Sequence, residues 1–167
     1  MKTLTAKPLT KEAFSEFGDV IEKTGSESFL INNGNCRRHH SLTQADVTGA
    51  NAQVIISIFE GTPYALPHTV DLVERHPLGS QAFYPLGPQD WLVIACSDEN
   101  GTPVNPQAFL ASGQQGINLR RGVWHGVLTP LYKPSDFLVV DRGGEGNNLE
   151  EYQLPLEQQF RVAVNQL

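Results

Sequence analysis

Short apolar runs, each ended by turn-forming residues, recur along most of the chain. Most runs are rich in β-branched and aromatic residues, and several alternate between apolar and polar positions, as half-buried strands do. The runs are "SFLIN" (28–32), "QVIISIF" (53–59), "TVDLVER" (69–75), "QAFYPL" (81–86), "WLVIACS" (91–97), "QAFLAS" (107–112), "GVWHGVL" (122–128) and "DFLVVDR" (136–142). Turn clusters such as "NNGN", "HPLG" and "SDENGTP" separate them. This pattern predicts an all-β fold, either a sandwich or a barrel.

One helix is predicted near the start of the chain, within "LTKEAFSEFGDV" (9–20). Thr10 is a good N-cap, Glu12 lies at the positive end of the helix dipole, and Phe14 and Phe17 share one side. Gly18 is expected to end the helix. The segment after Leu154 has no clear pattern and receives no assignment.

The length and composition fit a single globular domain spanning residues 1–167. The chain is 40% hydrophobic and 18% charged, which is ordinary for a soluble domain of this size. Its net charge of −6 argues against a nucleic-acid partner, although it leaves a small anionic substrate open. Two distant cysteines, no signal-peptide core and no membrane-length apolar run lead us to expect a cytoplasmic protein without a membrane partner.

The candidate chemistry lies around residues 71–86, "DLVERHPLGSQAFYPL". Glu74 and His76 are two residues apart, so they share one face of a strand. We expect the "HPLG" turn to form a hairpin that brings Gln81 of the next strand beside them. His125, three residues after the turn-permitting Gly122, would come from a further strand. An acid, two imidazoles and an amide would then meet inside one barrel.

Such mixed nitrogen and oxygen donors suit nickel, manganese, iron(II), cobalt or zinc. Each residue also has an ordinary structural interpretation. A histidine before proline is commonly a turn residue, and Glu74 could pair with Arg75 or Arg121 at the surface, where an ion pair contributes little. Gln81 could be an ordinary strand residue. Spacing alone leaves both interpretations open.

The arrangement Glu74-x-His76-x4-Gln81, followed by Gly122-x-x-His125, resembles the two metal motifs of cupin barrels. Most cupins have His-x-His followed by Glu, so Glu74 and Gln81 are departures from that pattern. The motifs "FGDVIE", "INNG", "VERHPLGSQAF", "GINL", "VWH" and "DFLVVDRGG", spread from residue 17 to residue 144, resemble the ureidoglycolate lyase family. That resemblance implies a cupin-like, jelly-roll barrel with one or two short helices, a homodimer and a nickel cofactor. It also implies cleavage of (S)-ureidoglycolate into glyoxylate and urea during allantoin degradation.

The implied reaction assigns metal binding to His76, His125, Gln81 and Glu74. If Glu74 is not a ligand, it is the expected general base. His40 is a candidate proton donor to urea only because the family has histidine there.

Four further residues have candidate roles, each with an alternative. Arg142 or Arg38 would bind the substrate carboxylate, although Arg38 in "NCRRHHS" also fits a solvated loop. Asp141 would orient a neighbouring side chain, or it could only cap a turn. Trp124 would border the substrate, although core packing is the more common role for such a residue. Asn33 would border the pocket, although "INNG" first predicts a hairpin turn.

Three functions remain in competition at this point. The first is the lyase, which releases intact urea. The second is an amidohydrolase acting on the same substrate, which would release ammonia and carbon dioxide. The third is a non-catalytic, ligand-binding cupin; the lack of any linker or helix-turn-helix segment counts against it.

Overall fold

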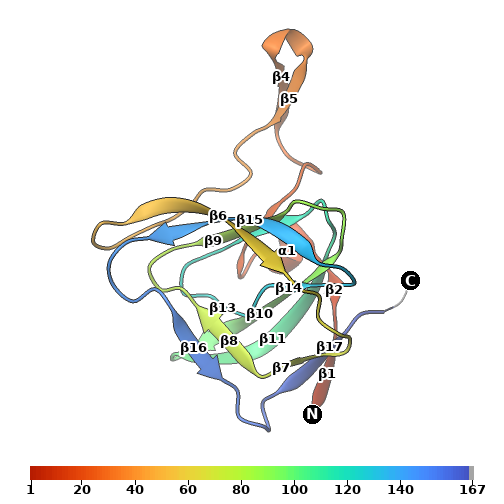
Figure 1. Ribbon diagram of the computed structural model, residues 1–167, viewed down its shortest axis with the longest axis vertical. Helices are drawn as coiled ribbons and strands as arrows, with labels where there is room; N and C mark the ends of the chain where they lie inside the picture. The colour runs from red at the N-terminus through yellow and green to blue at the C-terminus, as the bar shows by residue number, and fades with distance from the viewer. Residues whose placement is uncertain (166–167) are drawn as a thin grey trace.

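The computed structural model describes residues 1–165, and strands dominate it (Figure 1). Two large sheets face each other. The seven-stranded sheet has the order β16 (Glu150–Gln153), β8 (Leu72–Arg75), β13 (Trp124–His125), β10 (Trp91–Glu99), β11 (Thr102–Ala111) and β2 (Lys7–Pro8), with β14 (Thr129–Pro130) also paired to β10. The five-stranded sheet has the order β3 (Gly18–Ile21), β12 (Gly116–Leu119), β9 (Gln81–Pro85), β15 (Ser135–Gly143) and β6 (Gln53–Gly61). The expected all-β class is confirmed.

The main core fills the space between these two sheets. Alternate residues of each strand point inward, so Phe83 of β9, Phe109 of β11 and Phe137 of β15 are all buried there. The short helix α1 (Lys11–Phe14) adds Phe14, whose ring meets Phe109 edge-on at 5.4 Å between centroids. These inward-facing positions form the walls around the candidate site.

A second apolar layer covers the outer face of the seven-stranded sheet. The strands β1 (Lys2–Thr5), β17 (Phe160–Ala163) and β7 (His68–Val70) form a three-stranded sheet that packs there. Its contacts include Phe160 against the outward-facing side of β10. Both faces of β10 are therefore buried, which explains why "WLVIAC" is a continuous apolar run rather than an alternating one.

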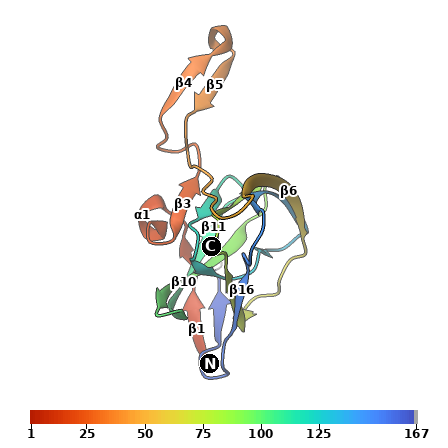
Figure 2. The same cartoon turned by 90° about the vertical axis from the view of Figure 1, so that its left-hand side faces the viewer.

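A separate hairpin projects from the body of the protein (Figures 1 and 2). It consists of β4 (Ser28–Ile31), a tight 3-10 turn η1 (Asn32–Gly34) and β5 (Cys36–His39). The two strands pair only with each other in the described part of the chain. We call residues 28–39 the arm.

Some of the elements predicted from the sequence are present in the structure, and others differ. Thr10 caps α1 as expected, because its side chain accepts the Ala13 N–H at 3.1 Å, but the helix is shorter than predicted and ends at Phe14. The predicted hairpin between the strands on either side of "HPLG" is wrong, because β8 and β9 belong to different sheets. The unassigned tail contains β17. No helix within residues 1–165 is long and apolar enough to cross a membrane.

Candidate metal and catalytic site

Glu74, His76 and His125 meet at one point on the inner side of the seven-stranded sheet. Strands β8 and β13 are antiparallel neighbours, and their register places His125 directly opposite Glu74. His76 follows β8 and shares the face of Glu74. One candidate ligand atom from each residue lies within 4.8 Å of the other two, and His125 is almost completely buried. The structure therefore brings together three of the four predicted metal-binding residues around one small volume.

The hydrogen bonds of the two imidazoles determine which ring nitrogen faces that volume. His76 Nδ1 lies 2.8 Å from the carbonyl oxygen of Asn148, and His125 Nδ1 lies 2.9 Å from that of Gly126. A carbonyl oxygen can only accept, so each Nδ1 carries the proton in the neutral ring. Each Nε2 is then a free lone pair, and both Nε2 atoms are buried without a hydrogen-bond partner. This is how protein structures commonly prepare a histidine to bind a metal.

Burial keeps His125 uncharged and makes Glu74 easier to protonate. Desolvation lowers the pKa of His125 to about 4, with a further lowering from nearby His76. Desolvation raises the pKa of Glu74; the neighbouring His76 opposes that shift and Glu151 adds to it. Glu74 Oε1 lies 4.0 Å from His76 Nε2. The cluster therefore offers a neutral His125 imidazole and a Glu74 carboxyl group whose pKa is higher than usual.

Gln81 reaches the barrel interior from the opposite sheet. It lies on β9 and shares the inward face of that strand with Phe83. Its Nε2 donates to Asp141 Oδ2 at 3.1 Å, which leaves the amide oxygen buried and without a partner. Asp141 of β15 thus determines which end of the amide faces the interior. Gln81 therefore enters the interior from β9 and not through the hairpin we expected, and its role as a metal ligand stays a prediction.

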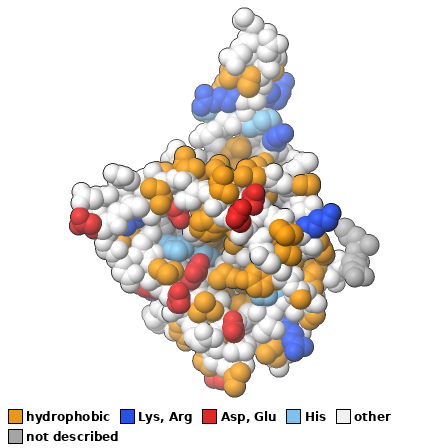
Figure 3. Space-filling view, in the orientation of Figure 1, with side chains coloured by type: hydrophobic (Ala, Val, Ile, Leu, Met, Phe, Trp, Pro, Cys, Tyr) orange, Lys and Arg blue, Asp and Glu red, His pale blue; other side chains and the backbone are white. Residues whose placement is uncertain are grey.

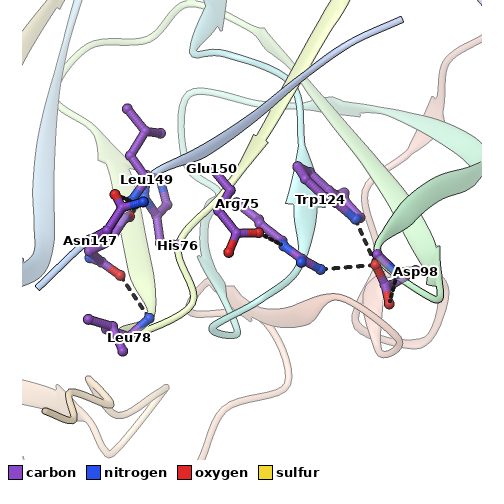
Figure 4. Close-up of polar contacts among 10 residues, drawn as sticks. Arg75, His76, Leu78, Asp98, Trp124, Asn147, Leu149 and Glu150 are labelled. Carbon is purple, nitrogen blue, oxygen red and sulfur yellow. Dashed lines mark hydrogen bonds and ion pairs between the residues drawn. The ribbon is translucent and has the colours of Figure 1, made fainter.

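Trp124 and Arg75 lie on the other side of the same strands (Figure 4). Trp124 is buried in the outer apolar layer and donates from its indole nitrogen to Asp98 Oδ1 at 2.8 Å. The Arg75 guanidinium stacks over the Trp124 ring at 4.3 Å and pairs with Asp98 and Glu150. Because neighbouring residues alternate between faces, Trp124 points away from the cavity that His125 enters. The structure does not bring Trp124 into the cluster.

Arg142 is also outside the cluster. Asp141 faces the interior, so the next residue on β15 faces outward. The buried Arg142 guanidinium donates to the carbonyl oxygens of Thr48 at 2.6 Å and Glu145 at 2.7 Å. A Cβ on Gly79 would lie only 2.7 Å from Arg142 Cβ, so the loop packs directly on this side chain. In this arrangement Arg142 holds two loops together.

The remaining predicted residues belong to the arm and its base. Arg38 lies on β5 opposite Phe29, and Asn33 lies at the tip with a left-handed backbone (φ 54°). His40 lines a cavity of about 530 Å³ at the base of the arm, together with Arg120. None of the three belongs to the Glu74–His76–His125 cluster of the same chain.

Comparison with known proteins agrees with the motif pattern. The family described as "Ureidoglycolate lyase" matches residues 1–163. The chain belongs to the ureidoglycolate lyase family. The ureidoglycolate lyase of Chelativorans sp. (strain BNC1) is 56% identical over 155 residues, covering 93% of this chain and 94% of that protein. The ureidoglycolate lyase of Mesorhizobium japonicum is 55% identical over 152 residues, covering 91% and 93%.

A solved structure with a related shape is a dTDP sugar isomerase from Desulfovibrio desulfuricans G20. Its TM-score is 0.43, with 14% sequence identity over 83% of this chain and 82% of that one.

Two backbone carbonyl groups that orient the histidines of the site were not predicted from the sequence. The backbone carbonyl of Asn148 orients His76, while the Asn148 side chain accepts the Leu78 N–H at 2.8 Å. Asn148 therefore links the segment before β16 to the turn after β8. Because the contact to His76 uses a backbone carbonyl 72 residues away, no side-chain motif could have revealed it. The Gly126 carbonyl plays the equivalent role for His125.

Proposed function

We propose that the protein cleaves (S)-ureidoglycolate to glyoxylate and urea, as part of allantoin catabolism, at the Glu74–His76–His125 cluster. Membership of the ureidoglycolate lyase family supports the reaction. The main support for this location is a pair of buried Nε2 atoms, those of His76 and His125, which have no hydrogen-bond partner and lie beside the Glu74 carboxyl group. Buried polar atoms without partners are uncommon in folded proteins and indicate a bound group that supplies the missing contacts.

The reaction requires one proton to change place. The substrate carbon carries a hydroxyl group, a carboxylate and a urea nitrogen. As the hydroxyl proton leaves, the oxygen electrons form the carbonyl of glyoxylate, and the carbon–nitrogen bond breaks toward nitrogen. A proton is then added to that nitrogen to give urea. No water enters the products, so the enzyme needs a base, an acid and a means of orienting the substrate.

The donors of the cluster fit a divalent metal. His76 Nε2, His125 Nε2, a Glu74 oxygen and Gln81 Oε1 provide two neutral nitrogens, one anionic oxygen and one neutral oxygen, a set that suits nickel, manganese, iron(II), cobalt or zinc. We propose nickel, in line with the family resemblance. When bound, such a metal would supply Lewis acidity that lowers the pKa of the substrate hydroxyl group.

Glu74 is the residue we propose for proton transfer where it does not bind the metal. Its raised pKa brings proton uptake closer to neutral pH, which favours general acid–base catalysis. Asp141 keeps the Gln81 amide oriented, so that Gln81 Oε1 faces the reacting groups. Phe83 and the other inward-facing apolar side chains exclude water from this volume.

We also propose a cytoplasmic homodimer. Cys36 and Cys96 are both free thiols, in keeping with a reducing compartment. Val54, Ile56 and Ile58 are exposed on the outer face of the edge strand β6, and a second copy would bury them.

Product analysis tests the proposed reaction. Protein stripped of metal and then resupplied with nickel, manganese or zinc is incubated with racemic ureidoglycolate, and urea, ammonia and glyoxylate are measured. We expect urea and glyoxylate in equal amounts from one enantiomer. Ammonia without urea would show the amidohydrolase reaction instead, and no turnover with any metal would favour a ligand-binding protein.

His125→Ala tests the site, with His68→Ala as the matched control on β7, outside the cluster. His125→Ala should reduce turnover by at least about 10³-fold and also abolish tight metal binding in calorimetry. His68→Ala should retain both. Denaturant unfolding of each variant separates loss of chemistry from loss of folding, and a folded, fully active His125→Ala would exclude the proposed site.

A further inference from the structure

Beyond its base, where the Phe29 and His40 rings lie 5.6 Å apart between centroids, the arm has no packing partner within the described chain. Its strands pair only with each other, and Figures 1 and 2 show it standing clear of both large sheets. Even so, Phe29 is 39% exposed and Leu30 is 56% exposed. An isolated two-stranded hairpin is at best marginally stable in water, and exposed apolar residues make that worse. These residues therefore indicate a surface that the arm meets outside its own chain.

The base of the arm is fixed to the barrel, so the arm does not depend on a loose linker for its direction. Thr43 Oγ1 donates to Asp19 and accepts from Asn118, in each case at 2.8 Å. The Asp46 backbone N–H donates to Ser80 Oγ at 2.8 Å, and the Thr48 carbonyl accepts from Arg142. These contacts hold the segment after the arm against the outer face of the five-stranded sheet.

A second uncovered apolar surface lies on the same side of the protein. Val54, Ile56 and Ile58 occupy the outer face of the edge strand β6 and are 49%, 70% and 61% exposed. Figure 3 shows hydrophobic side chains gathered where β6 and β15 lie, below the arm. We call these three residues the β6 strip. It is a row on an open sheet edge, which natural proteins normally cover.

A second copy of the chain fits both surfaces at once. In a two-fold dimer the contact is self-complementary, so each arm can lie on the β6 strip of the other copy. Phe29, on one face of the arm, would then pack on the strip of the partner. The arm projects from the end of the barrel where β6 lies (Figure 2). If the two copies exchange arms, the two arm-to-strip contacts therefore fall in one interface.

The arm and the interior of the barrel carry charges of opposite sign. Arg37 and Arg38 are consecutive on β5, so their side chains leave opposite faces of the arm, and neither forms an ion pair with an acid of residues 1–165. The barrel interior has the opposite sign, with Glu74 and Asp141 facing inward. A basic arm and an acidic barrel opening attract each other across a two-fold axis.

Among residues 1–165 of one chain, the arginines nearest the site in sequence, at positions 75, 121 and 142, are all engaged elsewhere and are not free to bind an anionic substrate. Arg75 is engaged with Asp98 and Glu150 on the outer face, and Arg142 is engaged with two backbone carbonyls. Arg121 pairs with Asp46 at the surface at 3.1 Å. Ureidoglycolate carries a carboxylate, which a bidentate arginine would recognise.

We propose that the arm crosses to a second copy, packs on its β6 strip and places Arg38 at the carboxylate of the substrate bound in that copy. This inference rests on the proposed function for its substrate. It gives Arg38, which lies on β5 away from the Glu74–His76–His125 cluster of its own chain, a role at the site of the partner. Arg38 shares its face of the arm with Phe29, so the same face that packs on the strip presents the guanidinium.

The docking step is tested by mass in solution. Light scattering after size-exclusion chromatography should show a dimer for the wild type and a monomer for Ile56→Glu. Leu156→Glu is the matched control, because Leu156 is 79% exposed but lies outside the strip, and it should remain dimeric. An Ile56→Glu protein that is still dimeric would overturn the proposed docking surface.

The active-site contribution is tested by complementation. Arg38→Ala should lower kcat/KM by about 10–100-fold, mainly through KM. His125→Ala and Arg38→Ala chains with different tags are then co-expressed. In a mixed dimer, the Arg38→Ala chain keeps an intact metal site and receives the intact arm of its partner. A one-to-one population should therefore regain about one quarter of wild-type activity, since half the dimers are mixed and half their sites are complete.

Two outcomes would overturn the inference and leave the proposed function intact. One is a mixture that is no more active than the separate variants, in a preparation where mixed dimers are isolated through both tags. The other is a fully active Arg38→Ala protein. If an Arg121→Ala protein then showed a raised KM, the substrate carboxylate would be placed on Arg121 of the same chain.

If His125→Ala does not fold, Glu74→Gln replaces it in the mixed dimer. A wild type that releases no urea would refute the proposed function alone, because the mass measurement still tests the docking.

Discussion

The buried His125 should make the metal-free protein lose stability in mild acid by an amount that the structure allows us to estimate. Its pKa is lowered to about 4 in the folded protein and is near 6.5 in the unfolded chain. Between those two pH values the unfolded chain binds a proton that the folded protein does not. The free energy of unfolding must therefore fall as pH falls through this window.

The size of the effect follows from the same two pKa values. The full difference corresponds to about 3 kcal/mol, reached once the pH is below the folded pKa. Between pH 7 and pH 5 the contribution of this one imidazole is about 2 kcal/mol. That is a substantial part of the stability of an ordinary domain.

Urea unfolding of the metal-stripped protein at pH 7 and pH 5 measures this loss, and His125→Asn provides the comparison. Asparagine does not titrate, so the variant should lack the histidine contribution, while all other titrating groups stay the same. We expect the loss from pH 7 to pH 5 to be about 2 kcal/mol smaller in the variant. Any constant penalty of the substitution cancels, because each protein is compared with itself. Equal losses in the two proteins would refute the claim that His125 is buried in its neutral form.

Three further predictions concern single side chains. Glu74→Gln removes the anionic donor and should weaken divalent-metal binding at least about tenfold in calorimetry, while the folded structure persists; unchanged affinity would remove Glu74 from the ligand set. Trp124→Phe removes the indole donor to Asp98 and should lower the free energy of unfolding by about 1–3 kcal/mol with no change in KM; a raised KM would restore Trp124 as a substrate contact. Thr10→Ala removes the cap of α1 and should cost about 1 kcal/mol of stability by thermal unfolding, so an unchanged melting temperature would contradict the cap.

The sequence by itself determined the strand runs, the all-β class and the cap at Thr10, because these depend on residues near one another in the chain. It also identified Glu74, His76 and His125 as a cluster. The first two must share a face through their spacing alone, and His125 came from a second motif. The two-residue period of a strand shows that two residues share a face. It cannot say which face becomes the interior.

Tertiary structure decided that choice and the partners of each strand. β8 pairs with β13 and β16, whereas β9 pairs with β12 and β15, so Gln81 approaches from the opposite sheet. Trp124 and Arg142 point away from the interior because the pairing of whole sheets turned the neighbouring residues, His125 and Asp141, inward. Such pairings join residues far apart in the chain, and their stability comes from the combined burial of both sheets rather than from any one segment.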